Sequence, residues 1–129
     1  MAARTRGMAP WMQEHGGAIL NISSIGGIRP SHAIGSYNVS KAALIHLTQQ
    51  LALELAPGVR VNAVAPGLVK THFARALWEG DEAGVSARHP LGRIGVPDDI
   101  AGVALFLVSD AASWITGEVY RADGGSHLV

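Results

Sequence analysis

The chain has 129 residues, of which 48% are hydrophobic and 16% charged, and its formal net charge at pH 7 is zero. This composition is typical of a globular protein and not of a disordered chain. A zero net charge gives no electrostatic reason to expect a nucleic acid or a membrane surface as partner. Because the chain has no cysteine, disulfides and cysteine-ligated metal sites are excluded.

Nothing in the sequence divides the chain into parts. It has no internal repeat, low-complexity tract or linker, and we expect one domain over residues 1–129. No apolar run approaches the roughly 20 residues that a membrane-spanning helix needs. Arg4 and Arg6 lie near the start, but the residues after them do not form the apolar segment of a signal peptide. We therefore expect a cytoplasmic protein.

Hydrophobic periodicity predicts strands that alternate with helices. The predicted strands are Ala18–Ser23, Val59–Ala65 and Val119–Ala122. The predicted helices are Met1–Glu14, interrupted near Pro10, then Tyr37–Ala56, Phe73–Glu79, and Ile100–Ser109 with its start at Pro97. The expected buried stripe of the long helix is Val39, Ala43, Leu47, Leu51 and Leu55. The alternation predicts an α/β fold with a parallel sheet and right-handed crossovers.

Three loops should meet at the edge of this sheet where the strands end. Ser24 follows the first strand, Pro66 and Gly67 follow the second, and Asp123 follows the third. In open parallel sheets, ligands bind beyond the carboxyl ends of the strands. The sequence therefore predicts a ligand site at this edge.

Tyr37 and Lys41 are the most informative pair in the chain. They are four residues apart in a predicted helix, and residues at this spacing share one helix face. A neighbouring ammonium favours the phenolate form of tyrosine, and such a phenol can exchange a proton with a carbonyl or alcohol oxygen. Ser24 lies thirteen residues before Tyr37. Taken alone, the pair is also compatible with an ordinary helix surface, where tyrosine and lysine are common neighbours.

Four segments together resemble the short-chain dehydrogenase/reductase family. The matching segments are Asn21-Ile22-Ser23-Ser24, Tyr37-x-x-x-Lys41, Val61 to Thr71 (VNAVAPGLVKT) and Ala122-Asp123-Gly124-Gly125. They occur in the family's order and at its spacing over nearly the whole chain. The resemblance implies an oxidoreductase that transfers hydride between NAD or NADP and a carbonyl/alcohol substrate.

The resemblance also implies a role for each matching residue. Tyr37 would be the general acid/base, Lys41 would hold the nicotinamide ribose hydroxyls, and Ser24 would donate a hydrogen bond to the substrate oxygen. The loop after the second strand would contact the nicotinamide. Its cofactor-binding candidates are Pro66, Gly67, Val69 and Thr71. From the residues alone, Tyr37 could instead cover a helix start, and Ser24 could tie down a turn.

The chain resembles the C-terminal half of a family member. Neither G-x-G-x-x-G nor T-G-x-x-x-G-x-G, the motifs that hold a dinucleotide pyrophosphate, occurs in the sequence. We therefore expect the N-terminal βαβ half of the doubly wound sheet to be missing, with weak cofactor binding and little or no turnover by this chain alone as a result. The alternative to an enzyme is a truncated, non-catalytic fragment or a subunit-contact module. A serine hydrolase is disfavoured because G-x-S-x-G does not occur.

The segment Thr71–Pro90 is the expected substrate lid, because long loops over sites usually set specificity. We expect His32, Phe73 and Trp78 to contact substrate. The six histidines show no tight ligand spacing, and we expect no metal site. The family resemblance implies a homo-oligomer, a dimer or tetramer, paired through the helix Tyr37–Ala56 and through the last helix and strand.

Overall fold

The computed structural model describes residues 2–129, with side chains described from Gly7 onward. Three parallel strands form one sheet in the order β1-β2-β3, with β1 at Gly17–Ile22, β2 at Val59–Pro66 and β3 at Val119–Ala122. The register pairs Gly17 with Val59 and Ala63 with Val119. The predicted α/β class with three parallel strands is confirmed, and the strand bounds differ from the predicted ones by at most one residue.

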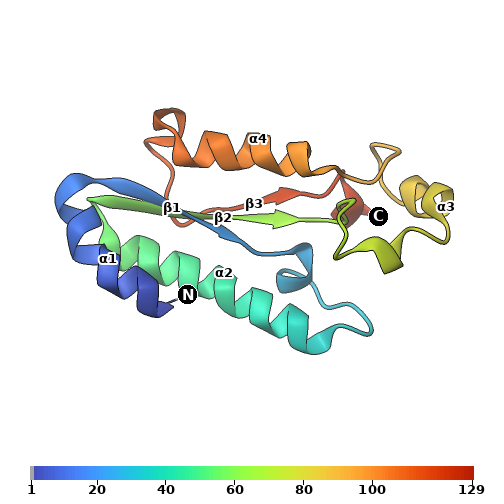
Figure 1. Cartoon of the computed structure of the whole chain (residues 1–129), viewed down its shortest axis with the longest axis horizontal. Coiled ribbons are helices and arrows are strands. Elements are labelled where there is room, and N and C mark those ends of the chain that lie inside the picture. Colours follow the sequence, from blue (N-terminus) through green and yellow to red (C-terminus); the bar gives the residue numbers. More distant parts are fainter. Residues whose placement is uncertain (1) are drawn as a thin grey trace.

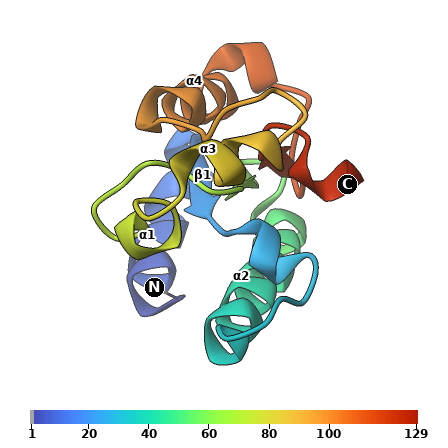
Figure 2. The ribbon, with the colours of Figure 1, turned by 90° about the vertical axis from the view of Figure 1, so that its right-hand side faces the viewer.

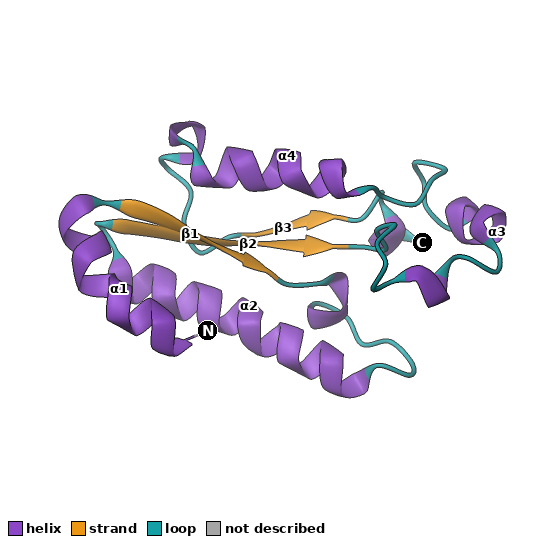
Figure 3. Cartoon of the chain, viewed as in Figure 1, coloured by secondary structure: helices purple, strands orange, loops and turns teal. Residues whose placement is uncertain are grey.

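Helices cover both faces of this sheet (Figure 1 and Figure 3). The helices α1 (Ala2–His15) and α2 (Gly35–Leu55) lie on one face, and α4 (Pro97–Val108) lies on the other. The start of α4 follows the predicted pattern, since proline takes its first position and the Asp99 carboxylate accepts the Val96 N–H at 2.7 Å. No helix within residues 2–129 has both the length and the apolarity needed to cross a bilayer.

Two predicted helix details are wrong. The first helix continues through Pro10 without interruption, which shows that the backbone donor that proline lacks is dispensable here. Met1, where that helix was predicted to begin, lies outside the described residues. In α2 the first half of the predicted stripe is wrong, because Val39 is 70% exposed and Ala43 is exposed. Its second half is confirmed, since Leu55 is buried and Leu51 packs against the core. Four residues turn a helix by about 400°, so a row spaced by four drifts by about 40° per step and leaves the buried face.

The core lies between β2 and the helices. Val61, Ala63, Val64 and Ala65 of β2 have no exposed surface. On the face toward α2, the β2 residues Val59 and Val61 pack with Ala52 and Leu55, and Met12 of α1 closes this cluster. A buried hydrogen bond from Asn21 Nδ2 to Thr48 Oγ1, 2.9 Å long, ties β1 to α2. These contacts fix α2 against the sheet and so fix the position of every side chain at its N-terminal end.

The segment between β2 and α4 folds differently from the prediction. The predicted helix Phe73–Glu79 is reduced to one 3₁₀ turn at Arg75–Leu77, and a helix not predicted from the sequence, α3, spans Glu82–Ala87. Asp81 begins α3 by accepting the Gly84 N–H at 2.9 Å with its side chain. An aspartate followed by a glutamate is a helix-start signal, but six helical residues are too few for periodicity to reveal.

The three strand ends meet at one edge, as predicted. The Ser23 N–H donates to the Val64 carbonyl at 2.8 Å, and the Gly67 N–H donates to the Ala122 carbonyl at 3.0 Å. A Cβ on Gly67 would lie 2.7 Å from Asp123 Cβ, so only glycine allows the second and third loops to come this close. Seen end-on, α3 and the C-terminal turn lie in front of the strands at this edge (Figure 2).

Candidate active site

Tyr37 and Lys41 lie side by side on the first turns of α2. The Lys41 Nζ is 5.5 Å from the centre of the Tyr37 ring. The same Nζ donates a hydrogen bond of 2.8 Å to the carbonyl oxygen of Ile22, the last residue of β1. An ammonium has three N–H donors, so two remain for other acceptors. The expected proximity of phenol and ammonium is present, and the ammonium is anchored to the strand end.

Ser24 begins the 3₁₀ turn Ile25–Gly27, directly after β1. Its Oγ accepts the Gly26 N–H at 3.1 Å, so the hydroxyl proton remains free to donate. Ser23 points to the other side, as its neighbouring position in a strand requires. It is buried, and its Oγ donates to the Lys41 carbonyl at 3.0 Å. The two serines therefore have different tasks: Ser23 anchors α2 to the end of the strand, and the Ser24 hydroxyl keeps a free donor.

Two glycines bring the turn after Ser24 into contact with α2. A Cβ on Gly27 would lie 2.6 Å from the backbone carbon of Lys41, and a Cβ on Gly26 would lie 2.1 Å from Asn38 Oδ1. Asn38 is buried, and its Nδ2 donates to Ser31 Oγ at 2.9 Å. This close packing holds the serine turn next to the helix that carries Tyr37 and Lys41. The Gly-rich composition of the loop thus has a packing reason.

The loop after β2 completes this side of the edge. Pro66 is the last residue of β2, and beyond Gly67 the chain pairs with a distant segment through a bridge between Val69 and Gly95. The Lys70 N–H donates to the Gly95 carbonyl at 2.8 Å, which fixes the direction of the loop. Thr71 Oγ1 accepts the Ala74 N–H at 3.2 Å, so its hydroxyl proton is also free to donate. The predicted nicotinamide loop is thus an ordered segment next to the strand ends.

The three substrate candidates differ in their surroundings. The Phe73 ring is 85% exposed and its centre lies 6.5 Å from that of Tyr37. Trp78 is half-buried beneath the Lys70 ammonium, which lies 5.8 Å from its ring centre, and its indole N–H is buried with no partner within residues 7–129. His32 is exposed in the loop before α2. Of the three, Phe73 lies next to a candidate catalytic residue, Tyr37.

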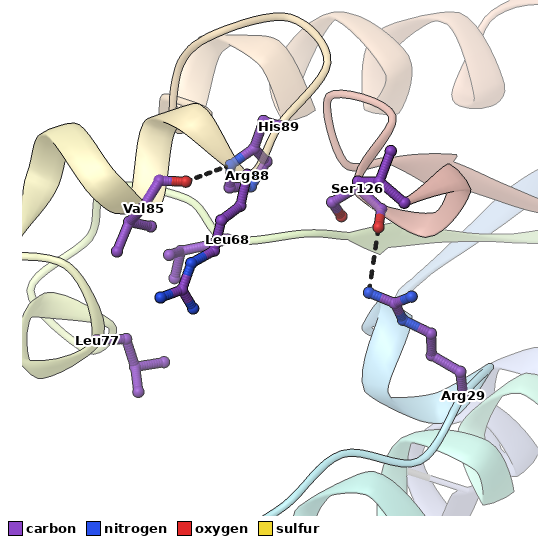
Figure 4. A pocket seen from close by; sticks show the side chains of 8 residues that line it. Arg29, Leu68, Leu77, Val85, Arg88, His89 and Ser126 are labelled. Atoms are coloured by element: carbon purple, nitrogen blue, oxygen red, sulfur yellow. Dashed lines mark hydrogen bonds between the residues drawn. The ribbon is translucent and has the colours of Figure 1, made fainter.

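A cavity of about 450 Å³ lies next to the loop after β2, which contributes Leu68 to its lining (Figure 4). Half of the lining belongs to the predicted lid, whereas sequence reasoning missed Arg29, Ser126 and Val129. Its apolar lining residues are Leu68, Leu77, Val85 and Val129, and its polar ones are Arg29, Arg88, His89 and Ser126. His89 is buried, and its Nδ1 is 2.9 Å from the Val85 carbonyl oxygen, which can only accept a hydrogen bond. The signal that could have located the cavity is Arg29, which lies five residues after Ser24.

Asp123 organises the C-terminal turn beside this cavity. Burial alone would raise the pKa of its carboxyl, but hydrogen bonds from the His127 ring, from the Gly125 N–H and from the Ser126 hydroxyl outweigh burial and lower the pKa. The His127 Nδ1 is 2.8 Å from Asp123 Oδ2. The carboxylate is therefore used within its own turn and stays ionised. Asp123, which was predicted at the end of the third strand, therefore stabilises the C-terminal turn.

The chain is similar to known proteins over nearly its whole length. Residues 1–127 match the family model described as Enoyl-(Acyl carrier protein) reductase. The human protein Dehydrogenase/reductase SDR family member 4 is 46% identical over 129 residues, which cover 97% of this chain and 46% of that protein. The chain spans about half the length of the curated relatives it matches.

The chain is also similar to solved structures in both fold and sequence. The structure of ElxO with NADP bound matches with a TM-score of 0.87 at 35% identity, over 97% of this chain and 52% of ElxO. A 7α-hydroxysteroid dehydrogenase in complex with NADH and 7-oxo glycochenodeoxycholic acid matches with a TM-score of 0.87 at 37% identity, over 94% of this chain and 49% of that enzyme. Because the family model extends over nearly the whole chain and the human relative shares close to half of its residues, the chain belongs to the short-chain dehydrogenase/reductase family.

Proposed function

We propose that this chain supplies the proton-transfer side of an oxidoreductase that interconverts a carbonyl and an alcohol, with NAD or NADP as the hydride carrier. The observation that carries the proposal is the Tyr37–Lys41 pair, whose ammonium is anchored to the end of β1. The similar structures of ElxO with NADP bound and of the hydroxysteroid dehydrogenase with NADH support the choice of cofactor.

Each residue of the pair has a defined task in this proposal. Tyr37 donates its phenolic proton to the substrate oxygen during reduction and accepts it back during oxidation. Lys41 stabilises the phenolate that forms, because its positive charge lies beside the ring. Ser24 donates its free hydroxyl proton to the same substrate oxygen and so fixes the orientation of the carbonyl. Phe73 covers this position from the lid, next to the Tyr37 ring. We propose His32 and Trp78 as further substrate contacts.

The donors at the strand edge fit one end of a nicotinamide cofactor. Two N–H groups of Lys41 are free for ribose hydroxyls, and Thr71 has a free hydroxyl proton. The backbone of Pro66, Gly67 and Val69 lies beside them and would hold the nicotinamide. When bound, the cofactor supplies or accepts the hydride. The sequence has no Gly-rich pyrophosphate motif, so this chain fits the nicotinamide half of the molecule only.

The first prediction concerns this cofactor. Purified chain should bind NADH or NADPH weakly, as followed by the fluorescence of the reduced nicotinamide. Lys41→Met should weaken that binding by about tenfold, because it removes charge-assisted hydrogen bonds to the ribose.

Arg121→Met is the charge control, because Arg121 is exposed on β3 and belongs neither to α2 nor to the loop after β2. It removes one positive charge and leaves every candidate site residue in place. Equal binding by wild type and Lys41→Met, or an equal loss in both variants, would exclude Lys41 as the cofactor ligand.

We also propose a homo-oligomer, a dimer or tetramer. The support is a set of large apolar side chains on α2, on α4 and in the turn before β3 that are exposed in the single chain. They include Leu53 at 78%, Leu105 at 69% and Trp114 at 98% exposed surface. Apolar patches of this kind commonly mark contact surfaces. The cytoplasmic location stays a prediction.

A further inference from the structure

The cavity next to the loop after β2 is lined by two positively charged side chains that face it from opposite sides. Arg29 follows the turn that Ser24 begins, and Arg88 is the residue directly after α3. Figure 4 shows the two guanidinium groups on opposite sides of the cavity, with Leu68, Leu77 and Val85 on the side of Arg88. A volume of about 450 Å³ is within the range of small-molecule sites.

These charges are not balanced by acidic side chains. None of the eight residues that line the cavity is an aspartate or glutamate. Within residues 7–129, neither guanidinium takes part in an ion pair, and the Arg88 side chain makes no hydrogen bond. Two other arginines do have acidic partners: Arg75 pairs with Glu79, and Arg93 pairs with Asp99. Arg29 and Arg88 therefore differ from Arg75 and Arg93, because no acidic side chain of the described residues accepts their N–H donors.

Arg29 is held in place without being neutralised. Its Nη2 donates to the Ser126 carbonyl oxygen at 3.2 Å, a neutral partner. The Ser126 N–H and hydroxyl both bond to Asp123, at 3.1 and 3.2 Å. The Asp123 carboxylate is already occupied by donors of its own turn, so it positions the carbonyl and leaves the guanidinium charge uncompensated. The remaining Arg29 N–H groups are free to bind a ligand.

We propose that the carbonyl substrate of this site carries an anionic group, a carboxylate or a phosphate, which binds between Arg29 and Arg88. Guanidinium groups bind planar or tetrahedral oxyanions through paired hydrogen bonds, which gives both charge and direction. The apolar residues of the cavity cover the carbon chain between the anion and the reacting carbonyl. The proposal rests on the proposed function, because it names the class of substrate for that same site.

The experiment measures binding of small ketones to the purified full chain by saturation-transfer NMR, without cofactor. The probes are 4-oxopentanoate, its neutral methyl ester, and dihydroxyacetone phosphate. We expect at least one of the two anions to bind about tenfold more tightly than the ester. The tighter anion identifies the group as carboxylate or phosphate. Arg29→Gln and Arg88→Gln should each remove most of this preference, and Arg88→Lys should restore part of it.

Arg121→Gln is the matched control, because Arg121 is exposed on β3 and does not line this cavity. It should keep the preference. Equal binding of the anions and the ester, or an equal loss in Arg121→Gln, would overturn the proposal. Displacement of the anions by NADPH would also overturn it, since the arginines would then bind cofactor phosphate.

Tyr37→Phe separates this inference from the proposed function. It should retain the preference for anions while losing hydride transfer. Anion binding that persists in a chain without any turnover would contradict the function and leave the arginine site standing. Turnover of neutral and anionic ketones with equal efficiency would contradict the arginine site and leave the function standing.

Discussion

Lys41 is the residue on which the geometry of the site depends most. Its ammonium contacts the Tyr37 ring and the Ile22 carbonyl, and its backbone carbonyl accepts from Ser23. One residue thus joins the end of β1 to the face of α2 that carries Tyr37. Sequence spacing predicted the pair with Tyr37, because helix geometry alone puts such residues on one face. The bonds to Ile22 and Ser23 come from tertiary packing, so local spacing could not predict them.

Arg88 and His89 lie in the segment predicted as the lid, but their place in the cavity was not predicted. Both lie beyond α3 and enter the cavity because of how the lid folds back onto the strand ends. Their neighbours in the cavity, Arg29 and Ser126, come from distant parts of the chain. A cavity assembled from three separate loops has no periodic signature, so only the three-dimensional arrangement reveals it.

The pKa of Asp123 gives a prediction at the residue scale. A carboxyl whose pKa is lowered in the folded state stabilises the fold above its unfolded pKa, about 3.9, and this contribution is lost as the pH falls below that value. Asp123→Asn should lower the free energy of unfolding at pH 7 by roughly 1–3 kcal/mol, because bonds to a buried carboxylate are lost. It should also make the decline from pH 5 to pH 3 shallower.

Urea unfolding at pH 7, 5 and 3 measures both effects. Asp98→Asn is the control, because Asp98 is an exposed acid in the first turn of α4. If Asp123→Asn followed the wild-type pH dependence, the carboxylate would have no special role in the C-terminal turn.

At the scale of elements, the contact between the serine turn and α2 decides whether the site assembles. The order of strands and helices was predictable, because their apolar runs and punctuating prolines are strong local signals. The approach of Gly27 to the Lys41 backbone was not, since glycine in a loop has several explanations before the neighbours are known. The short helix α3 was missed for the related reason that its only signal is the Asp81 cap.

A methyl group at Gly27 should separate these two elements. A Cβ there would lie 2.6–2.8 Å from backbone atoms of Lys41 and Ala42, which cannot move as a side chain can. Gly27→Ala should therefore lower the free energy of unfolding by roughly 1–3 kcal/mol and weaken cofactor binding. Thermal or urea unfolding measures the first effect, and reduced-nicotinamide fluorescence measures the second.

Gly35→Ala, at the first residue of α2, provides the comparison. A Cβ on Gly35 has nothing within 4 Å, and alanine favours helical structure. Stability should stay the same or rise. If the two variants behaved alike, close packing of the serine turn would not be what holds the site together.

At the scale of the whole molecule, the sheet has an open side. β1 pairs with β2 only, and no strand within residues 2–129 covers its other edge. The chain matches about half the length of its curated relatives. An uncovered strand edge and exposed apolar helix faces both favour association with another chain. The arrangement of layers thus leaves the chain with surfaces that a partner would cover.

Light scattering should therefore give the mass of two or four chains. Leu53→Glu places a charge on the exposed face of α2 and should shift the mass toward a single chain. The control Leu91→Glu changes an exposed loop residue and should leave the mass unchanged. A stable, monodisperse single chain in the wild type would contradict the proposed assembly.

The central claim is that Tyr37 transfers the proton while hydride moves to a carbonyl carbon. The chain has two tyrosines. Tyr120 lies on β3 and packs against Phe106 of α4, so Tyr120→Phe is a matched control. The direct measurement is the transfer of deuterium from 4-deuterated NADPH or NADH to a ketone, at cofactor concentrations shown by fluorescence to saturate the chain. We predict transfer by wild type and Tyr120→Phe, and a rate at least about 100-fold lower in Tyr37→Phe. Equal rates in all three proteins, or no transfer by saturated wild type, would contradict the account.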